Sequence, residues 1–550
     1  MTEKNQNAES DQPSVGTIEN EKYLNQPSGG MIENEKYLDR ALMEYCNSDA
    51  YPFHMPGHKR QTMGNWNCEA IDITEITGFD NLHHAEGILL EAQQRAAQTF
   101  GADESFFLVN GSTAGLLAAV CGTVKKGGRL LMARNCHKAV YHAVYLMELQ
   151  TEYLYPEQTE FGIQGSIAPE QVQRMLEQYP DTQAILLTSP TYDGVVSDIA
   201  AIAEIVHAHQ IPLIVDEAHG AHFGFSERFP KKAISYGADL CIESVHKTLP
   251  AYTQTALLHY RKNPWVDLER VKRYLGIYQS SSPSYVLMAG IDRCTRILRE
   301  QGTTLFAAFE QQLHDFYQSC ENLQYISVFP ENGNDDGIWD RDSSKILICA
   351  EAVGLHGQDL ADLLTQKYHL ELEMASGHYA TALTSIMDTK EGFDRLFAAL
   401  EEIDQSFHDG SDDLEKENGQ QIFTTDAIYR PAKKVMKISE AMDAPKEKVK
   451  LLESAGSVSG EFVYLYPPGI PILAPGELVT PEILDADKIT PPPAHNGLYQ
   501  ILLAMKYLRS SDEEWTVFVN AFDKLIQNNN GVVSLAAMNL PADWKEHLSV

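Results

Sequence analysis

Short apolar runs alternate with amphipathic segments through the first half of the chain. The runs have the length of buried strands and cover residues 105–109, 128–132, 184–188, 211–215, 238–242 and 255–259. Residues 87–100, 116–124 and 198–209 between them have helical patterns. Strands that alternate with helices predict an α/β domain with a mainly parallel sheet, in which ligands bind at the carboxyl ends of the strands.

A lysine and an acid follow two neighbouring apolar runs. Asp216 comes directly after the run 211–215, and Lys247 comes shortly after the run 238–242. Pyridoxal phosphate (PLP) needs such a pair, because a lysine amine forms a Schiff base with its aldehyde and a carboxylate keeps its pyridine nitrogen protonated. The alternative is a surface lysine and a strand-end aspartate of any α/β protein. The residues at the ends of the other predicted strands are needed to distinguish this alternative from a PLP site.

A turn rich in glycine and hydroxyl groups follows the first predicted strand. Residues 110–115 read Asn-Gly-Ser-Thr-Ala-Gly and open a helix. Free N–H groups at a helix start, together with the Ser112 and Thr113 hydroxyls, can donate hydrogen bonds to phosphate. The turn lacks the G-x-G-x-x-G spacing and the lysine of nucleotide-binding loops, which disfavours a dinucleotide or ATP. A simple helix N-cap that binds nothing is the alternative.

His137 and Tyr192 extend the same pattern. His137 follows the second predicted strand and Tyr192 follows the third. An imidazole at such a junction can lie flat on a cofactor ring, although a helix-start residue is the alternative for a lone histidine. Together with Ser112, Asp216 and Lys247 they form a set in which every member stands at a strand end, which favours a PLP site over the separate structural alternatives.

Composition and charge narrow the class of protein. The net charge of −34 argues against nucleic-acid binding, which needs a basic surface, and against attraction to anionic lipid. It is compatible with a cationic substrate, although solubility alone explains an acidic balance. The sequence contains no apolar run as long as a membrane span, no signal-peptide pattern, and no zinc spacing among its eight cysteines. We therefore expect a cytoplasmic protein without a bound metal.

The length of 550 residues exceeds one compact core, so several domains are expected. The polar N-terminus contains the near-duplicate segments 18–24 and 32–38, which predict a disordered extension, and the acidic, breaker-rich residues 409–415 predict a linker. The predicted parts are an extension at residues 1–39, a PLP-binding large domain at 40–300, a small domain at 301–408 and a C-terminal domain at 415–550.

Eight short motifs indicate a family. They are residues 53–59 (FHMPGHK), 80–84 (DNLHH), 111–113 (GST), 135–138 (NCHK), 216–222 (DEAHGAH), 244–247 (SVHK), 466–469 (YPPG) and 475–477 (PGE). In these motifs the chain resembles the prokaryotic ornithine/lysine/arginine decarboxylase family, which are PLP enzymes of the aminotransferase fold (fold type I). The resemblance implies an aminotransferase-like large domain, a smaller α/β domain and a C-terminal α+β domain.

The resemblance also implies roles for individual residues. Lys247 would bind PLP covalently, Asp216 would pair with the pyridinium nitrogen, and His137 would stack on the ring. Ser112, Thr113, Ser244 and His246 would hold the phosphate, and Ser280 and Ser281 would reach the phosphate of a neighbouring subunit. The other implied cofactor-binding residues are Gly111, Ala218 and His219. The candidates for binding the substrate are Asp80, His83 and Glu477, of which Glu477 is expected at the distal cation.

Two departures from the family pattern refine this expectation. The large inducible members carry an extra N-terminal domain that helps assemble rings of dimers, and this chain has a short polar segment in its place. It is therefore more similar to the shorter, biosynthetic type, and a homodimer or a higher even oligomer with shared active sites is expected. Asp193 stands where short members often have a second aromatic residue, which leaves the choice of substrate open.

The predicted reaction is PLP-dependent α-decarboxylation of a basic L-amino acid to CO2 and a precursor in polyamine biosynthesis. Guanidinium would favour a carboxylate that accepts two hydrogen bonds, whereas an ammonium needs only a point charge, and the sequence contains candidates for either. Arginine is favoured over lysine and ornithine. Another PLP enzyme of fold type I, an aminotransferase or a carbon–sulfur lyase, is one alternative. A non-catalytic binding or regulatory protein on the same fold is the other.

Overall fold

The computed structural model of the chain describes residues 47–61, 68–331, 333, 335–408, 431–449, 453–465, 470–481 and 483. The chain separates into two units, residues 1–50 and residues 51–550, and the helices and strands described below belong to the second. The predicted extension at residues 1–39, the linker at 409–415 and the motif at 466–469 lie outside the described residues.

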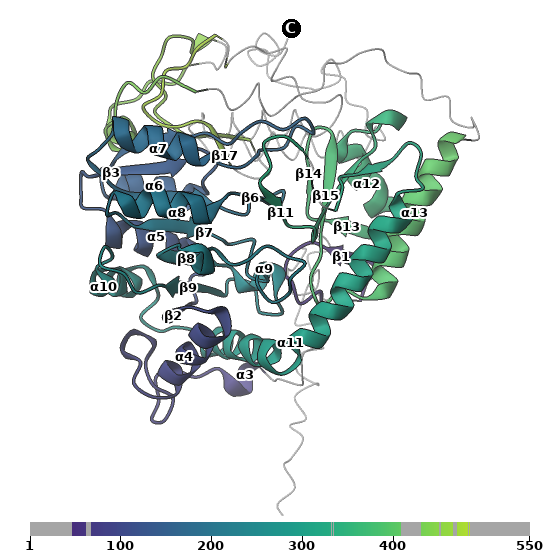
Figure 1. Ribbon diagram of the computed structural model, residues 1–550, viewed down its shortest axis with the longest axis horizontal. Coiled ribbons are helices and arrows are strands. Elements are labelled where there is room, and N and C mark those ends of the chain that lie inside the picture. The colour runs from purple at the N-terminus through teal and green to yellow at the C-terminus, as the bar shows by residue number, and fades with distance from the viewer. Residues whose placement is uncertain are drawn as a thin grey trace, which may run out of the picture. The chain divides into compact units, whose positions relative to one another are not determined.

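A seven-stranded sheet forms the centre of the large domain (Figure 1). In spatial order its strands are β2 (Glu104–Leu108), β9 (Ala256–Tyr260), β8 (Leu240–Glu243), β7 (Leu213–Asp216), β5 (Thr182–Thr188), β3 (Arg129–Ala133) and β4 (Gln150–Leu154). Only β9 runs antiparallel to its neighbours, so the prediction of a mainly parallel sheet is confirmed. The carboxyl ends of the six other strands therefore lie along one edge of the sheet.

Close helix packing fixes the turn after β2. Helix α5 (Gly111–Thr123) begins at that turn and packs against α10 (Leu268–Tyr278) and against the sheet. A Cβ atom on Gly115 would lie 2.6 Å from Leu108 Cδ1, and one on Gly122 would lie 2.6 Å from Val271 Cγ2. Glycine is required at both positions because the helix approaches strand and neighbouring helix too closely for any side chain.

A second sheet follows the long helix α11 (Tyr285–Cys320). In spatial order its strands are β10 (Ser327–Val328), β12 (Lys345–Cys349), β15 (Tyr379–Leu383) and β14 (Met374–Ala375). Helices α12 (Gly357–Tyr368) and α13 (Lys390–His408) accompany it, and α13 packs against α11 (Figure 1). The predicted boundary at residue 300 lies inside α11, which continues through it without a break.

Two short strand pairings link this smaller sheet to earlier parts of the chain. β1 (Tyr51–Phe53) pairs in parallel with β13 (Leu370–Leu372), and β6 (Val195–Val196) pairs antiparallel with β11 (Asp340–Arg341). One apolar core continues from Phe53 through α11 into the smaller sheet. β6 follows the carboxyl end of β5. The pairing of β6 with β11 therefore brings residues after β11 to the edge of the large sheet at which the parallel strands end.

The described C-terminal segment packs on the large domain. It contains α15 (Ile438–Asp443), β16 (Val463–Leu465) and β17 (Ile470–Leu473), and Ile438 and Ala474 belong to the core of the large sheet. Within the part of the chain that the structure describes, no helix has both the length and the apolar character needed to cross a bilayer.

Candidate active site

Lys247 lies on the short helix α9 (Val245–Thr248), which begins just after β8. Its Nζ lies 2.8 Å from Nε2 of His219. Burial lowers the pKa of Lys247 to about 8, while the charge of Asp216 acts in the opposite direction. Burial and the charge of Lys247 hold the pKa of His219 well below its ordinary value. The lysine is therefore a good nucleophile near neutral pH, beside an uncharged imidazole.

The motif at residues 53–59 holds the helix that carries Lys247. The Gly57 N–H donates to the His246 carbonyl oxygen at 2.7 Å, and a Cβ atom on Gly57 would lie 2.8 Å from the main chain of Leu249. The Ser385 hydroxyl donates to the Gly57 carbonyl oxygen at 2.6 Å. This loop thus connects α9 to the smaller domain, and its glycine permits that contact.

Asp216 is the last residue of β7 and is 3% exposed. Burial raises the pKa of Asp216 to about 6, against the effect of the Lys247 charge. Among the described residues only the Ala218 N–H, at 3.2 Å from Oδ1, donates to this carboxylate. A buried carboxylate with so few donors fits a ligand that brings a further N–H, as a protonated pyridine does.

The predicted phosphate turn lies at the start of α5. Gly111 has φ +72°, which favours glycine, and the Asn110 side chain makes no capping hydrogen bond to the first turn. The Ser244 hydroxyl donates to Ser112 Oγ at 3.0 Å, so the ends of β2 and β8 contribute two adjacent hydroxyls. Thr113 follows in the same first turn. Hydroxyls beside a helix start suit an anion such as phosphate.

Two further histidines lie at the same edge of the sheet. His137 precedes α6 (Lys138–Leu146), and its Nδ1 accepts from the Ala139 N–H at 3.2 Å. Although the His137 side chain is exposed, desolvation by the atoms around it and the charge of Lys247 lower its pKa, which favours the neutral ring. His246 Nδ1 lies 2.7 Å from the Thr255 carbonyl oxygen and must donate to it. The neutral His246 ring therefore offers a lone pair at Nε2, which does not favour its predicted contact with phosphate.

Asp80 and His83 make their contacts with residues other than these side chains. The Asp80 carboxylate accepts hydrogen bonds from the N–H groups of Asn81, Glu86, Gly87 and Leu89 at 2.7–3.2 Å and so organises its own loop. Exposed His83 contacts the Ser280 carbonyl oxygen through Nε2 at 2.7 Å, beside exposed Ser281. The substrate-binding roles of Asp80 and His83 remain predictions that these contacts do not favour.

Glu477 is 1% exposed and forms an ion pair with Arg134, whose Nη2 lies 3.0 Å from Oε2. The Ala474 N–H donates to the same oxygen at 2.8 Å. Burial raises the pKa of Glu477, and the charge of Arg134 opposes the shift. A substrate cation at this carboxylate would compete with Arg134. The substrate-binding role of Glu477 also remains a prediction, and the ion pair favours a structural contact instead.

Two residues from the smaller domain were not anticipated. Lys345 Nζ lies 3.1 Å from Asp342 Oδ2 and 3.4 Å from the His219 carbonyl oxygen, and it is fully buried. Glu373 accepts a hydrogen bond from the Tyr192 hydroxyl. A lysine at the start of the apolar run 345–349 is an unusual pattern and could have indicated Lys345. Nothing in the local sequence indicates Glu373.

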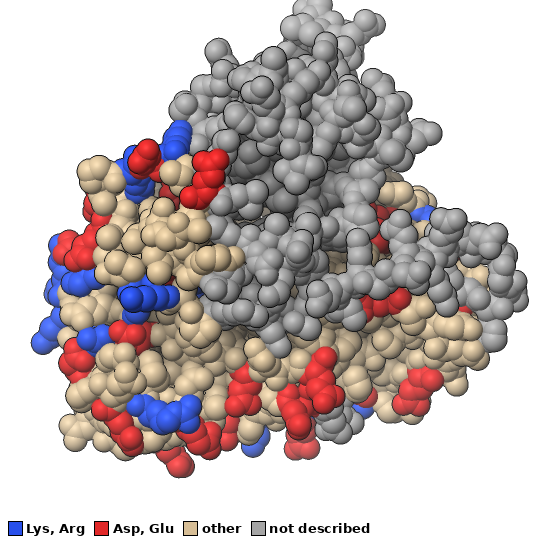
Figure 2. Space-filling model, turned by 90° about the horizontal axis from the view of Figure 1, so that it is seen from above, with Lys and Arg blue, Asp and Glu red and all other residues tan. Residues whose placement is uncertain are grey.

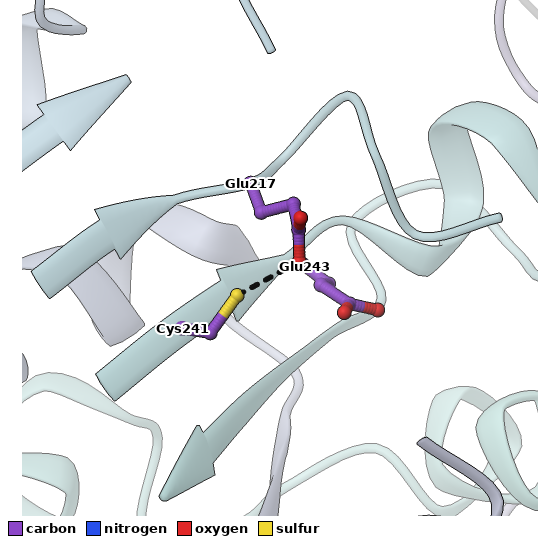
Figure 3. Close-up of side chains that lie close together, drawn as sticks. All are labelled: Glu217, Cys241 and Glu243. Atoms are coloured by element: carbon purple, nitrogen blue, oxygen red, sulfur yellow. Dashed lines mark hydrogen bonds between the residues drawn. The ribbon is translucent and has the colours of Figure 1, made fainter. Parts of the chain in front are cut away.

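A buried polar cluster includes Glu217 and Glu243, the residues next to Asp216 and Ser244 in the sequence. The side chains of Glu217, Cys241 and Glu243 approach within 4.8 Å of one another, and Figure 3 shows Cys241 directed at Glu217. Lys232 Nζ lies 3.0 and 3.3 Å from the two oxygens of Glu243. The lysine supplies the positive charge that these acids need, so the cluster gives no reason to assign a metal.

Solved structures share this fold. The lysine decarboxylase of Francisella novicida matches with a TM-score of 0.65 and 19% identity, over 84% of this chain and 76% of its own. The constitutive lysine decarboxylase of Escherichia coli matches with a TM-score of 0.65 and 20% identity, over 81% of this chain and 76% of its own. The predicted fold class is therefore confirmed.

Sequence relatives cover most of the chain. The arginine decarboxylase of Bacillus subtilis is 31% identical over 456 residues, which span 80% of this chain and 91% of the relative. The arginine decarboxylase of Halalkalibacterium halodurans is 32% identical over 455 residues, which span 80% and 90%. The major domain of the Orn/Lys/Arg decarboxylases matches residues 37–336, and their C-terminal domain matches residues 418–486. The resemblance indicated by the motifs is confirmed, and the chain belongs to the Orn/Lys/Arg decarboxylase family.

Proposed function

We propose that this protein decarboxylates a basic L-amino acid, with arginine favoured over lysine and ornithine, and releases CO2 and an amine used in polyamine biosynthesis. The observation that carries the proposal is the placement of a lysine with a lowered pKa beside a buried carboxylate at the ends of adjacent strands. The two relatives named arginine decarboxylase support arginine as the substrate.

PLP is the cofactor that fits these residues. When bound, it supplies an electron sink for the bond that breaks at Cα. Asp216 would keep a proton on the ring nitrogen, Ser112, Ser244 and the first turn of α5 would hold the phosphate, and His137 would cover the ring. Lys247, whose Nζ lies 2.8 Å from the His219 ring, would return a proton to Cα after CO2 leaves.

The pairing of Arg134 favours decarboxylation over transamination. An aminotransferase usually fixes this carboxylate with an arginine, whereas a decarboxylase benefits from leaving its charge unneutralised. Arg134 precedes the motif that contains His137, but its guanidinium is already paired with Glu477 at 3.0 Å. This pairing supports a decarboxylase.

We expect the capture of PLP by the apo chain to become about tenfold faster per pH unit up to about pH 8 and to level off above it. Only the unprotonated Lys247 amine reacts, and raising the pH increases its fraction. Absorbance changes after mixing measure the rate. In the Asp216→Asn variant the plateau should begin at lower pH, because the Asp216 charge raises the pKa of Lys247. A rate independent of pH would contradict this account.

The acidic surface suits a cationic substrate. Figure 2 shows Asp and Glu side chains spread over the described surface, including its lower edge, with Lys and Arg mostly on the left. The net charge is −34. Such a balance raises the local concentration of small cations and disfavours nucleic acid.

We further propose a cytoplasmic homodimer, or a higher even oligomer, with shared active sites. Ser280 and Ser281 are exposed, and His83 contacts Ser280. Exposed apolar side chains occur near both contact partners in the sequence: Ile76 (49%) and Phe79 (44%) precede His83, and Ile277 (60%) precedes Ser280. Apolar exposure of this kind is typical of a protein interface. We also propose four parts of the chain, an extension at residues 1–39, a large domain at 40–300, a small domain at 301–408 and a C-terminal domain at 415–550, with helix α11 shared between the second and the third.

A product screen tests the proposed function. The PLP-loaded protein is supplied with carboxyl-labelled arginine, lysine and ornithine, and both labelled CO2 and keto acids are measured. We expect CO2 with the matching amine, fastest from arginine, and no keto acid. Keto acid without CO2 would indicate an aminotransferase. The absence of both products, together with the absence of PLP attachment, would indicate a non-catalytic protein.

A further inference from the structure

A buried ion pair of the smaller domain contacts the segment that holds His219. Lys345 is the first residue of β12, and both Lys345 and Asp342 are fully buried. Lys345 Nζ lies 3.1 Å from Asp342 Oδ2 and donates to the His219 carbonyl oxygen at 3.4 Å. The His219 ring in turn lies 2.8 Å from Lys247 Nζ through Nε2. The Lys345 ammonium therefore contacts the same residue as the reactive lysine.

The surroundings of the pair fix its orientation. Arg341 Nη2 donates to the Lys345 carbonyl oxygen at 2.6 Å. The second carboxylate oxygen of Asp342, Oδ1, lies 3.1 Å from His222 Nε2 and accepts from the Ser344 N–H at 3.0 Å. These contacts leave Oδ2 for Lys345, so the ammonium is held at one place beside the His219 main chain.

Stability alone does not account for a charged residue at this position. The rest of β12 is the apolar run ILIC. Removing two charges from water costs free energy, and a buried ion pair often stabilises a fold no better than apolar side chains of the same size. A role in the neighbouring site explains why a lysine occupies the start of this strand.

The charges that act on Lys247 show what this role is. Burial lowers the pKa of Lys247, the carboxylates of Asp216 and Glu373 oppose that shift, and the positive charge of Lys345 adds to it. The histidines close to Lys247 contribute little charge near neutral pH, because desolvation lowers their pKa values; they are His137, His219 and His246. Lys345 is thus the source of positive charge at Lys247.

We propose that Lys345, oriented by Asp342, is a positioning residue that favours the uncharged, nucleophilic form of Lys247. The inference rests on the proposed function, in which Lys247 attaches PLP. A fixed positive charge disfavours a second ammonium nearby and so increases the fraction of neutral Lys247 amine. In the attachment, the Lys247 nitrogen bonds to the aldehyde carbon of PLP, and both amine protons leave with the aldehyde oxygen as water. The reactivity of Lys247 therefore depends on a residue of the smaller domain.

The pH dependence of PLP capture by the apo chain, followed by absorbance, tests this proposal. Lys345→Met removes the charge and keeps an unbranched side chain. Its plateau should begin about one pH unit higher than that of the wild type, with capture about tenfold slower at pH 7. Lys345→Arg keeps the charge and should retain the wild-type plateau. Lys232→Met is the matched control, because Lys232 is also buried and paired with a carboxylate, Glu243, at 3.0 Å, but the charges acting on Lys247 do not include it.

A further variant separates charge from loosening of the site. The arginine in Lys345→Arg cannot lose its proton. Adding Asp342→Asn to Lys345→Arg removes the compensating negative charge, so the plateau should begin at lower pH than in Lys345→Arg alone. Loosening would instead expose Lys247 to water and move the plateau to higher pH in each variant.

Two results would overturn the proposal. One is an unchanged plateau in a Lys345→Met protein that still attaches PLP to the peptide containing Lys247. The other is an equal upward shift in Lys345→Met, Lys345→Arg and Lys232→Met. If Lys345→Met does not fold, a plateau that stays in place or rises when Asp342→Asn is added to Lys345→Arg also overturns it. Wild-type protein that neither attaches PLP at Lys247 nor releases CO2 would refute the proposed function itself, a result distinct from an active wild type with unshifted variants.

Discussion

Lys247→Ala is expected to lower the rate of CO2 release by at least about ten thousand-fold, because the change removes both the amine that attaches the cofactor and a carrier of the Cα proton. The rate is measured with labelled arginine, the favoured substrate. Borohydride reduction provides a second measurement. It should fix PLP on the peptide that contains Lys247 in the wild type and leave the variant unlabelled.

Lys138→Ala is the matched control for this change. Lys138 is exposed at the start of α6, next to His137, and should retain a rate within about twofold of the wild type. Lys345 is the competing candidate, because it is buried and contacts the His219 carbonyl oxygen at 3.4 Å. Cofactor on the Lys345 peptide, or CO2 release by Lys247→Ala, would show that the assignment is wrong.

The central sheet could be predicted because its strands are buried on both faces. β7 and β8 are buried at every position, so they read as continuous apolar runs that end in polar residues. Parallel pairing then brings Asp216 and the helix of Lys247 to one edge. β4 was missed because it is the edge strand, and its sequence, QTEYL, mixes polar and apolar residues. The antiparallel direction of β9 leaves no mark in its own sequence.

Contacts across long separations could not be predicted. Tyr192 and Glu373 lie 181 positions apart, and their hydrogen bond depends on how the smaller domain folds back. Arg134 and Glu477 lie 343 positions apart. The PGE motif indicates a fixed loop but does not reveal that Arg134, the residue after β3, forms an ion pair with its acid. Motifs thus locate reactive groups, while the partner of each charge depends on tertiary structure.

Glu243→Gln is expected to destabilise the fold by about 3–5 kcal/mol, because it leaves the Lys232 ammonium buried without a full counter-charge. Although burial alone would raise the pKa of Glu243, Lys232 holds it below its ordinary value, so this carboxylate carries the charge of the pair. The free energy of unfolding, measured by urea denaturation with PLP bound in each variant, checks this value.

Glu217→Gln is the matched control, with an expected loss below about 1.5 kcal/mol. Burial and the neighbouring charge of Glu243 raise the pKa of Glu217 well above its ordinary value, so the acid is already neutral and an amide preserves its charge state. Its Oε1 can still accept from the Ala233 N–H, at 2.9 Å in the wild type.

In Glu243→Gln, Glu217 can ionise beside Lys232 and offset part of the loss. The double variant should therefore lose more stability than the two single losses together, and simple additivity would show that the two acids do not share one charge.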